Sequence, residues 1–234
     1  MTATLEKPKA APSENPQALF GSIFGPNLPA GTYKVKVIKG KDEYLTTFTL
    51  KYPDNSPYTA EDRKVQQDVT MKLYEQSEEL AYIYAAQEGM VSQAKAVVLK
   101  NPKFGKIVTP FIKELEEHNS ALVFRGGDFY INTEEKLAEQ ISELYGQVSS
   151  YPGRPGNAQI DRAVTLDDEL RKASLKFEQL RTEKLKKVNS TITSDKIFQP
   201  IRALTVDEFR KGESGGGINP KNPMGSAWQI MRIH

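Results

Sequence analysis

The sequence predicts an α+β fold that is mainly α, with an N-terminal β-hairpin followed by an antiparallel bundle of about four helices. Residues 31–52 alternate polar and apolar side chains with a period of two, which is typical of strands. Beyond them, apolar residues recur every three or four positions, as in amphipathic helices. The predicted parts are a disordered leader (1–28), the hairpin or partial β-domain (29–54), the helical bundle (55–190) and an extended tail (191–234).

The leader begins with residues 1–16, which are rich in Pro, Ala, Lys and Glu, a composition typical of disorder. This stretch contains no apolar region of the kind that a secretory signal needs. Two explanations stay open: the chain is cytoplasmic, or it is a fragment whose signal lay upstream.

The hairpin prediction rests on an apolar stripe, Tyr33, Val35 and Val37, and on turn-forming residues at 39–43. The second strand carries its apolar residues less regularly. A lone hairpin is marginal in water. We therefore expect it to lie on the helices, or to have lost neighbouring strands that belonged to a longer chain.

The first helix is expected to start at a capping-box-like pair, Thr59 and Asp62, and to run to about Leu99. At about 1.5 Å per residue it is roughly 60 Å long. Gln76 and Gln87 interrupt its apolar seam. The seam residues are Val65, Val69, Leu73, Leu80, Ile83, Met90, Ala94 and Val97.

Three further helices follow in the prediction. The second starts at Thr109-Pro110, with proline at the first helical position. An Asn132…Glu135 pair caps the third. The fourth runs from about Asn157 to Val188. In the tail, Thr205 caps a short helix near 205–211, and Trp228 is a candidate for docking.

The amino-acid composition excludes several kinds of partner and site. Lys and Arg number 32 against 30 Asp and Glu, so the net charge of +2 gives no basic footprint for nucleic acid. Cysteine is absent, which excludes disulfides, thiolate metal sites and cysteine nucleophiles. No apolar run approaches the ~20 residues that span a bilayer. We expect neither a nucleic-acid partner nor a membrane span.

No catalytic residue, cofactor site or metal ligand is predicted. His118 has no second histidine at i+4, so it is interpreted as an ordinary helix histidine. The glycines at 126–127 and 215–217 lack the context of a phosphate loop. Clustered carboxylates are interpreted as solvated helix faces among lysines; they are Glu78-Glu79, Glu114/Glu116/Glu117, Glu134-Glu135 and Asp167-Asp168-Glu169.

One short stretch, S-S-Y-P-G-R-P-G-N at 149–157, is the candidate site. Prolines fix φ and glycines permit tight turns, so it is expected to reverse the chain between the third and fourth helices. Tyr151 is expected to cover the end of the bundle and Arg154 to bind carbonyls at a helix C-terminus. The alternative is an interaction loop. The residues concerned are Tyr151, Pro152, Gly153, Arg154 and Pro155.

Four stretches occur in a familiar order: P-A-G-T-Y-K-V-K-V, S-P-Y-T-A-E-D-R, L-Y-E-Q-S-E-E-L-A-Y and L-Y-G-Q-V-S-S-Y-P-G-R-P-G-N-A-Q-I-D-R. Over roughly residues 28–212 the chain resembles the C-terminal region of large secreted Bacteroidetes proteins with a sortilin-type (vacuolar-sorting-receptor-like) β-propeller, often labelled glycosyl hydrolases. The resemblance implies that the hairpin is the remnant of an immunoglobulin-like β-domain. It also implies a periplasmic or extracellular location. The propeller is absent here, so no catalytic residue is carried over.

The leading hypothesis is a non-catalytic accessory or interaction module that packs on a parent polypeptide or a partner protein. The open edge of the hairpin offers a place for a partner's strand. Two alternatives remain: part of a glycoside hydrolase whose catalytic region is missing here, and a free-standing helical adaptor. The oligomeric state is left open.

Overall fold

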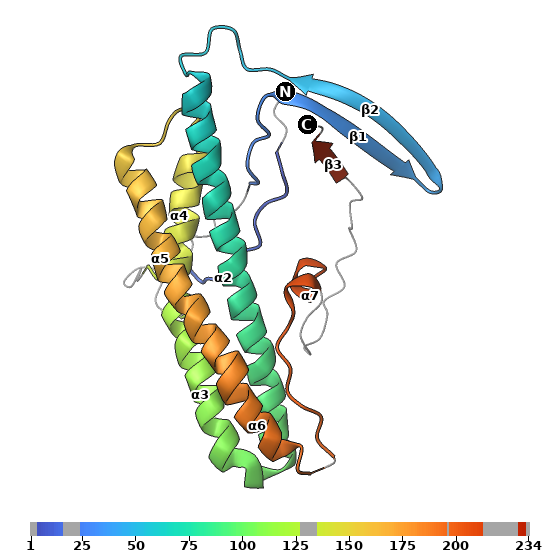
Figure 1. Ribbon diagram of the computed structural model, residues 1–234, viewed down its shortest axis with the longest axis vertical. Helices are drawn as coiled ribbons and strands as arrows, with labels where there is room; N and C mark the ends of the chain where they lie inside the picture. The colour runs from blue at the N-terminus through green and yellow to red at the C-terminus, as the bar shows by residue number, and fades with distance from the viewer. Residues whose placement is uncertain (1–3, 16–23, 127–134, 196, 213–228, 233–234) are drawn as a thin grey trace.

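The computed structural model describes residues 4–15, 24–126, 135–195, 197–212 and 229–232, the last as backbone only. Helices dominate it, and an antiparallel hairpin precedes them (Figure 1). The predicted fold class, α+β and mainly α, is therefore confirmed.

The hairpin consists of β1 (Gly31–Lys39) and β2 (Asp42–Leu50) joined by a two-residue turn. Gly40 in this turn has φ 64°, a left-handed value that favours glycine. The register pairs Tyr33 with Phe48, whose rings stack at 5.5 Å. Paired residues lie on the same face of a sheet, so Tyr33, Val35 and Val37 share one face with Phe48 and Tyr44, whereas Ile38 and Leu45 lie on the other.

β3 (Gln229–Arg232) pairs antiparallel with β1 and gives the strand order β2-β1-β3. Part of the predicted tail is therefore a strand. The hairpin arches away from the helices near the top of Figure 1. The expectation that it lies on the helices is therefore wrong, although Tyr33 at its base is buried.

The helices form three rods (Figure 1). The first is α2 alone, and the second, which runs in the opposite direction, is α3 followed by α4. The third runs in the direction of α2 and is continuous through one π-helical turn. The bounds are α2 Ala60–Lys100, α3 Gly105–Leu122, α4 Leu137–Ser150, α5 Asn157–Gln179, the π-helical turn η2 Leu180–Lys184 and α6 Leu185–Ile192.

Two predicted helix starts are wrong. A 3-10 turn, η1 (Pro102–Phe104), leads directly into α3, so α3 begins before Thr109 and contains Pro110, at the cost of one main-chain hydrogen bond. In α4 the Glu139 carboxylate accepts a hydrogen bond from the Lys136 N–H at 2.9 Å, so the cap lies after Glu135. Asn132 lies outside the described residues.

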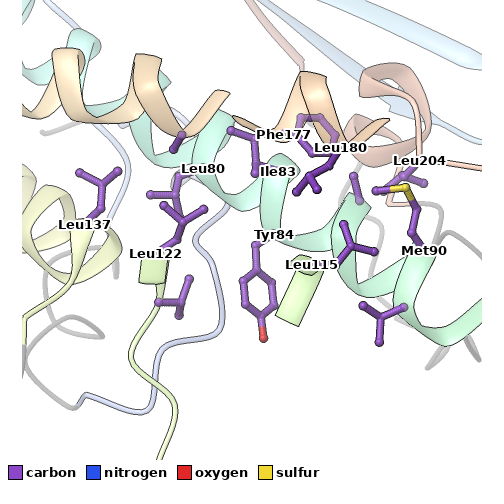
Figure 2. Packing of buried hydrophobic residues seen from close by; sticks show 14 of the residues in the cluster. Leu80, Ile83, Tyr84, Met90, Leu115, Leu122, Leu137, Phe177, Leu180 and Leu204 are labelled. Carbon is purple, nitrogen blue, oxygen red and sulfur yellow. The ribbon is translucent and has the colours of Figure 1, made fainter. Parts of the chain in front are cut away.

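The core lies between the rods and draws residues from each of them (Figure 2). Leu80 and Ile83 come from α2, Leu115 from α3, Leu137 from α4 and Phe177 from α5. All five are buried. Burial of these apolar faces, at about 25 cal/mol per Å², is the main stabilising term of the bundle.

The two glutamines of the α2 seam are buried rather than exposed. Gln87 is 0% exposed, and its side-chain amide donates to Asn119 Oδ1 at 2.7 Å. Gln76 donates to the Ala163 carbonyl at 3.1 Å and to Asp167 at 3.2 Å. These polar groups link α2 to the other two rods instead of breaking its packing.

Residues 4–15, predicted to be disordered, form instead an extended segment held against the bundle. The Lys9 ammonium donates to the carbonyls of Phe209 and Arg210 at 2.5 and 2.8 Å. The Glu14 carboxylate pairs with Arg125 at 3.3 Å and accepts the Gly126 N–H at 2.7 Å. Composition indicated disorder, but backbone and side-chain polar groups of this segment find partners on the bundle.

The chain after α6 also lies on the bundle. Gln93 bonds both backbone groups of Arg202, at 2.9 and 3.0 Å, and Asn189 does the same for Ile201. The predicted short helix is α7 (Val206–Arg210), and the Thr205 hydroxyl accepts the Glu208 N–H at its start. Trp228 lies outside the described residues.

Candidate interaction surface

The corner between α4 and α5 reverses the chain, as predicted (Figure 1). Within it Gly153 and Pro155 are buried, whereas Tyr151, Pro152 and Arg154 are exposed. Tyr151 keeps 50% of its surface exposed. The corner is therefore both a structural turn and a solvent-facing surface.

Gly153 lies between two tyrosine rings, those of Tyr58 and Tyr151, which meet edge to face with centroids 5.7 Å apart. A Cβ on Gly153 would lie 2.5 Å from Tyr58 Cε1 and 2.8 Å from Tyr151 Cε1. The corner thus requires glycine for close approach. The contact joins two stretches, S-P-Y-T and Y-P-G-R-P, that are far apart in the sequence.

Arg154 does not bind carbonyls at a helix C-terminus, contrary to the prediction. Within the described residues its guanidinium makes no hydrogen bond or ion pair. The Thr59 hydroxyl and N–H are the main groups that lower the pKa of the Asp62 carboxyl, and the charge of Arg154 adds to their effect. Arg154 is thus an exposed cation beside the start of α2.

A third tyrosine and a second arginine extend this surface toward the hairpin. The Arg63 guanidinium lies 3.9 Å from the ring centroid of Tyr52 and 5.7 Å from that of Tyr58. It also donates to Ser56 Oγ. No periodic pattern predicts this cluster from the sequence, because the segment between β2 and α2 is irregular.

The outer edge of β2 is the second exposed feature. In the described part of the chain no strand pairs with it. Its register with β1 is unbroken over nine pairs, and it contains no lysine, proline or bulge, the usual protections of an edge strand. Exposed apolar side chains lie nearby: Ile38 at 47%, Tyr44 at 56% and Leu45 at 70%.

Hydrogen-bond alternation identifies the free groups on this edge. Lys39 and Asp42 close a two-residue turn and therefore form a hydrogen-bonded pair. The pairs then alternate along the hairpin. The N–H and C=O groups that point outward from β2 belong to Glu43, Leu45, Thr47 and Thr49.

His118 belongs to a polar network between α2 and α3. Its Nδ1 lies 2.8 Å from Gln87 Oε1, and the Asn119 amide donates to Glu88 at 2.9 Å. Burial, with a smaller effect from Lys176, lowers the pKa of His118. No group of three or more His, Asp or Glu side chains in the described ranges is placed to hold a metal ion.

The carboxylate clusters lie on helix faces and are mostly paired. Their partners are lysine, arginine or serine side chains, and for Glu78 a backbone N–H. The pairs are Glu78–Lys9, Glu79–Ser174, Glu114–Lys184, Glu116–Lys95, Glu117–Lys113, Asp167–Lys72, Asp168–Arg171 and Glu169–Arg162. Glu134 and glycines 215–217 lie outside the described residues. Gly126, with φ 87°, follows the end of α3 and binds Glu14.

Among the helices of the described chain, none is long and apolar enough to cross a membrane. Searches against protein-family models, curated proteins and solved structures find no match. The resemblance to sortilin-type propeller proteins therefore stays a prediction.

Proposed function

We propose that this chain is a non-catalytic interaction module whose hairpin binds an extended strand of a partner polypeptide at the β2 edge. The observation that carries the proposal is the nine-residue edge, without lysine, proline or bulge, on a hairpin that arches away from the bundle. Strand addition supplies main-chain hydrogen bonds for affinity, and alternate side-chain contacts for specificity.

The energetics favour such a partner. A two-stranded hairpin alone is marginal in water, and each added strand stabilises the sheet. A fourth strand would satisfy the outward N–H and C=O groups and would extend the apolar face of Tyr33 and Phe48. The partner strand is expected to alternate apolar and polar residues, with the apolar ones on that face.

The bundle acts as the rigid support in this proposal. By the motif resemblance, the partner strand would belong to the β-domain of a secreted parent polypeptide. A separate partner protein is equally compatible with the physical argument. In both cases we propose binding rather than catalysis as the function of residues 31–52.

The test is capture by a photo-cross-linking amino acid in cells that express the chain naturally. The photo-cross-linking amino acid replaces Leu45, which is 70% exposed on β2. In the control variant it replaces Leu175, which is 66% exposed on α5. We expect one defined product from position 45 only. Cross-linking of the same partner from both positions, or from Leu175 alone, would contradict the proposal.

A matched pair of substitutions then tests the backbone mechanism. Thr47→Pro removes an outward N–H and leaves the ladder to β1 intact, whereas Thr47→Val keeps the N–H. We expect the cross-link at position 45 to be lost with proline and retained with valine. Equal capture by both variants would show that binding does not use the strand edge.

A further inference from the structure

A pocket lies between the base of the hairpin, the start of α2 and the corner. It has a volume of about 370 Å³, within the size range of small-ligand sites. Its walls combine apolar and amide side chains with two cations, Lys51 and Arg63. The apolar walls are Leu28, Pro29, Leu50, Tyr52, Pro53 and Pro152.

The charges in this pocket are unbalanced. No Asp or Glu lines it among the residues that the structure describes. Neither Lys51 nor Arg63 forms an ion pair with a carboxylate of the described residues. Elsewhere on the chain most arginines do: Arg125, Arg162, Arg171, Arg181 and Arg202 each pair with a carboxylate.

Arg63 is held in place for recognition. It is half-buried, lies over Tyr52 at 3.9 Å and uses one donor on Ser56. Stacking fixes the plane of the guanidinium, so its remaining donors keep the fork geometry that matches a carboxylate. Arg63 therefore loses less conformational entropy on binding a ligand than a freely rotating arginine would.

We propose that this pocket binds an acidic peptide segment, with its carboxylate on Arg63 and its neighbouring residues against the proline and leucine walls. Gln67 and Asn27 supply amide groups for the peptide backbone, whereas Gln66, whose side-chain N–H groups bind Thr70 and Val148, offers its amide oxygen. Inorganic phosphate fits the site less well, because it needs clustered donors and leaves the apolar walls unused. The proposal does not depend on strand addition at β2, since Thr47 does not line the pocket.

The test is an NMR titration of the full chain that follows the Arg63 side-chain N–H and the amides of Tyr52, Gln66 and Gln67. The probes are acetyl-Leu-Glu-Pro-amide, acetyl-Leu-Gln-Pro with a free C-terminus, the neutral acetyl-Leu-Gln-Pro-amide and inorganic phosphate. A charge-assisted hydrogen bond predicts about ten- to hundredfold tighter binding of the acidic probes than of the neutral one. The first two probes distinguish a side-chain carboxylate from a terminal one.

Variants complete the test. Arg63→Gln should abolish the preference for the acidic probes, Arg63→Lys should retain part of it, and Arg171→Gln, at an exposed arginine of α5, should leave it unchanged. Circular dichroism verifies that each variant is folded. Equal affinity for acidic and neutral probes, no shift at the pocket residues, or phosphate binding as tight as peptide binding would each overturn the proposal.

Discussion

Replacement of Gly153 by alanine tests the corner most sharply. The added Cβ would lie 2.5 Å from Tyr58 Cε1, whereas carbon atoms in contact prefer about 3.5–4.0 Å. The tyrosine rings must therefore move apart by about 1 Å, which follows from that preferred separation. Both rings are partly exposed and can shift outward, so the cost lies in the lower part of the range for overpacking, about 1–2 kcal/mol.

The assay is thermal unfolding followed by far-UV circular dichroism. In a domain of this size each kcal/mol lowers Tm by about 2–4 °C, so we expect a decrease of about 2–8 °C for Gly153→Ala. Gly156→Ala is the matched control, because its Cβ would meet nothing closer than Gln159 Oε1 at 4.0 Å. Gly156 is the N-cap of α5, where alanine is less favourable than glycine, so the unfolding free energy of this variant should fall by less than about 1 kcal/mol.

A double-mutant cycle identifies the cause. If the clash with the ring is responsible, the cost of Gly153→Ala should largely disappear in a Tyr58→Ala background, because contacting residues are not additive. Equal stability of Gly153→Ala and Gly156→Ala would contradict the clash. A loss of stability that persists undiminished without the Tyr58 ring would contradict it as well.

Three further predictions concern the bundle and the short helix. Leu115→Ala, at a side chain that is 0% exposed, should lower the free energy of unfolding by about 3 kcal/mol in denaturant titration, with an unchanged m value. A decrease of only a few tenths of a kcal/mol would place Leu115 outside the core. Asn119→Ala leaves the buried Gln87 N–H without its acceptor and should cost about 2 kcal/mol, whereas a neutral result would mean that the amide finds another partner. The hydrogen bond from the Thr205 N–H holds the pKa of Glu208 at about 2. The contribution of the Glu208 carboxylate to folding stability is therefore complete above the ordinary carboxyl pKa and is lost as pH falls toward about 2. Carboxyl NMR titration should show this low value, and Thr205→Pro, which removes the N–H, should raise it.

Local signals in the sequence predicted local structure well. The capping boxes at Thr59 and Thr205 depend on residues three positions apart, and both form. The apolar period of α2 identified a buried seam. The helix start predicted at Pro110 was wrong. Proline is common at the first position of a helix, but here a preceding 3-10 turn continues directly into α3.

Features that depend on contacts between distant segments were not predictable in this way. Gln76 and Gln87 looked like interruptions because their partners, Ala163 and Asn119, lie on other rods. The reversal at the corner followed from its prolines and glycines. The contact of Gly153 with Tyr58 did not, since no local pattern relates the two positions.

The most direct test of the central claim is amide hydrogen exchange on β2, with and without the partner captured by cross-linking. The proposed strand addition predicts slower exchange at Glu43, Leu45, Thr47 and Thr49, whose N–H groups point outward from the hairpin. The amides of the intervening residues, already bonded to β1, should change much less. Protection on the helices with no change on these four amides would contradict the claim that the chain binds its partner through the β2 edge.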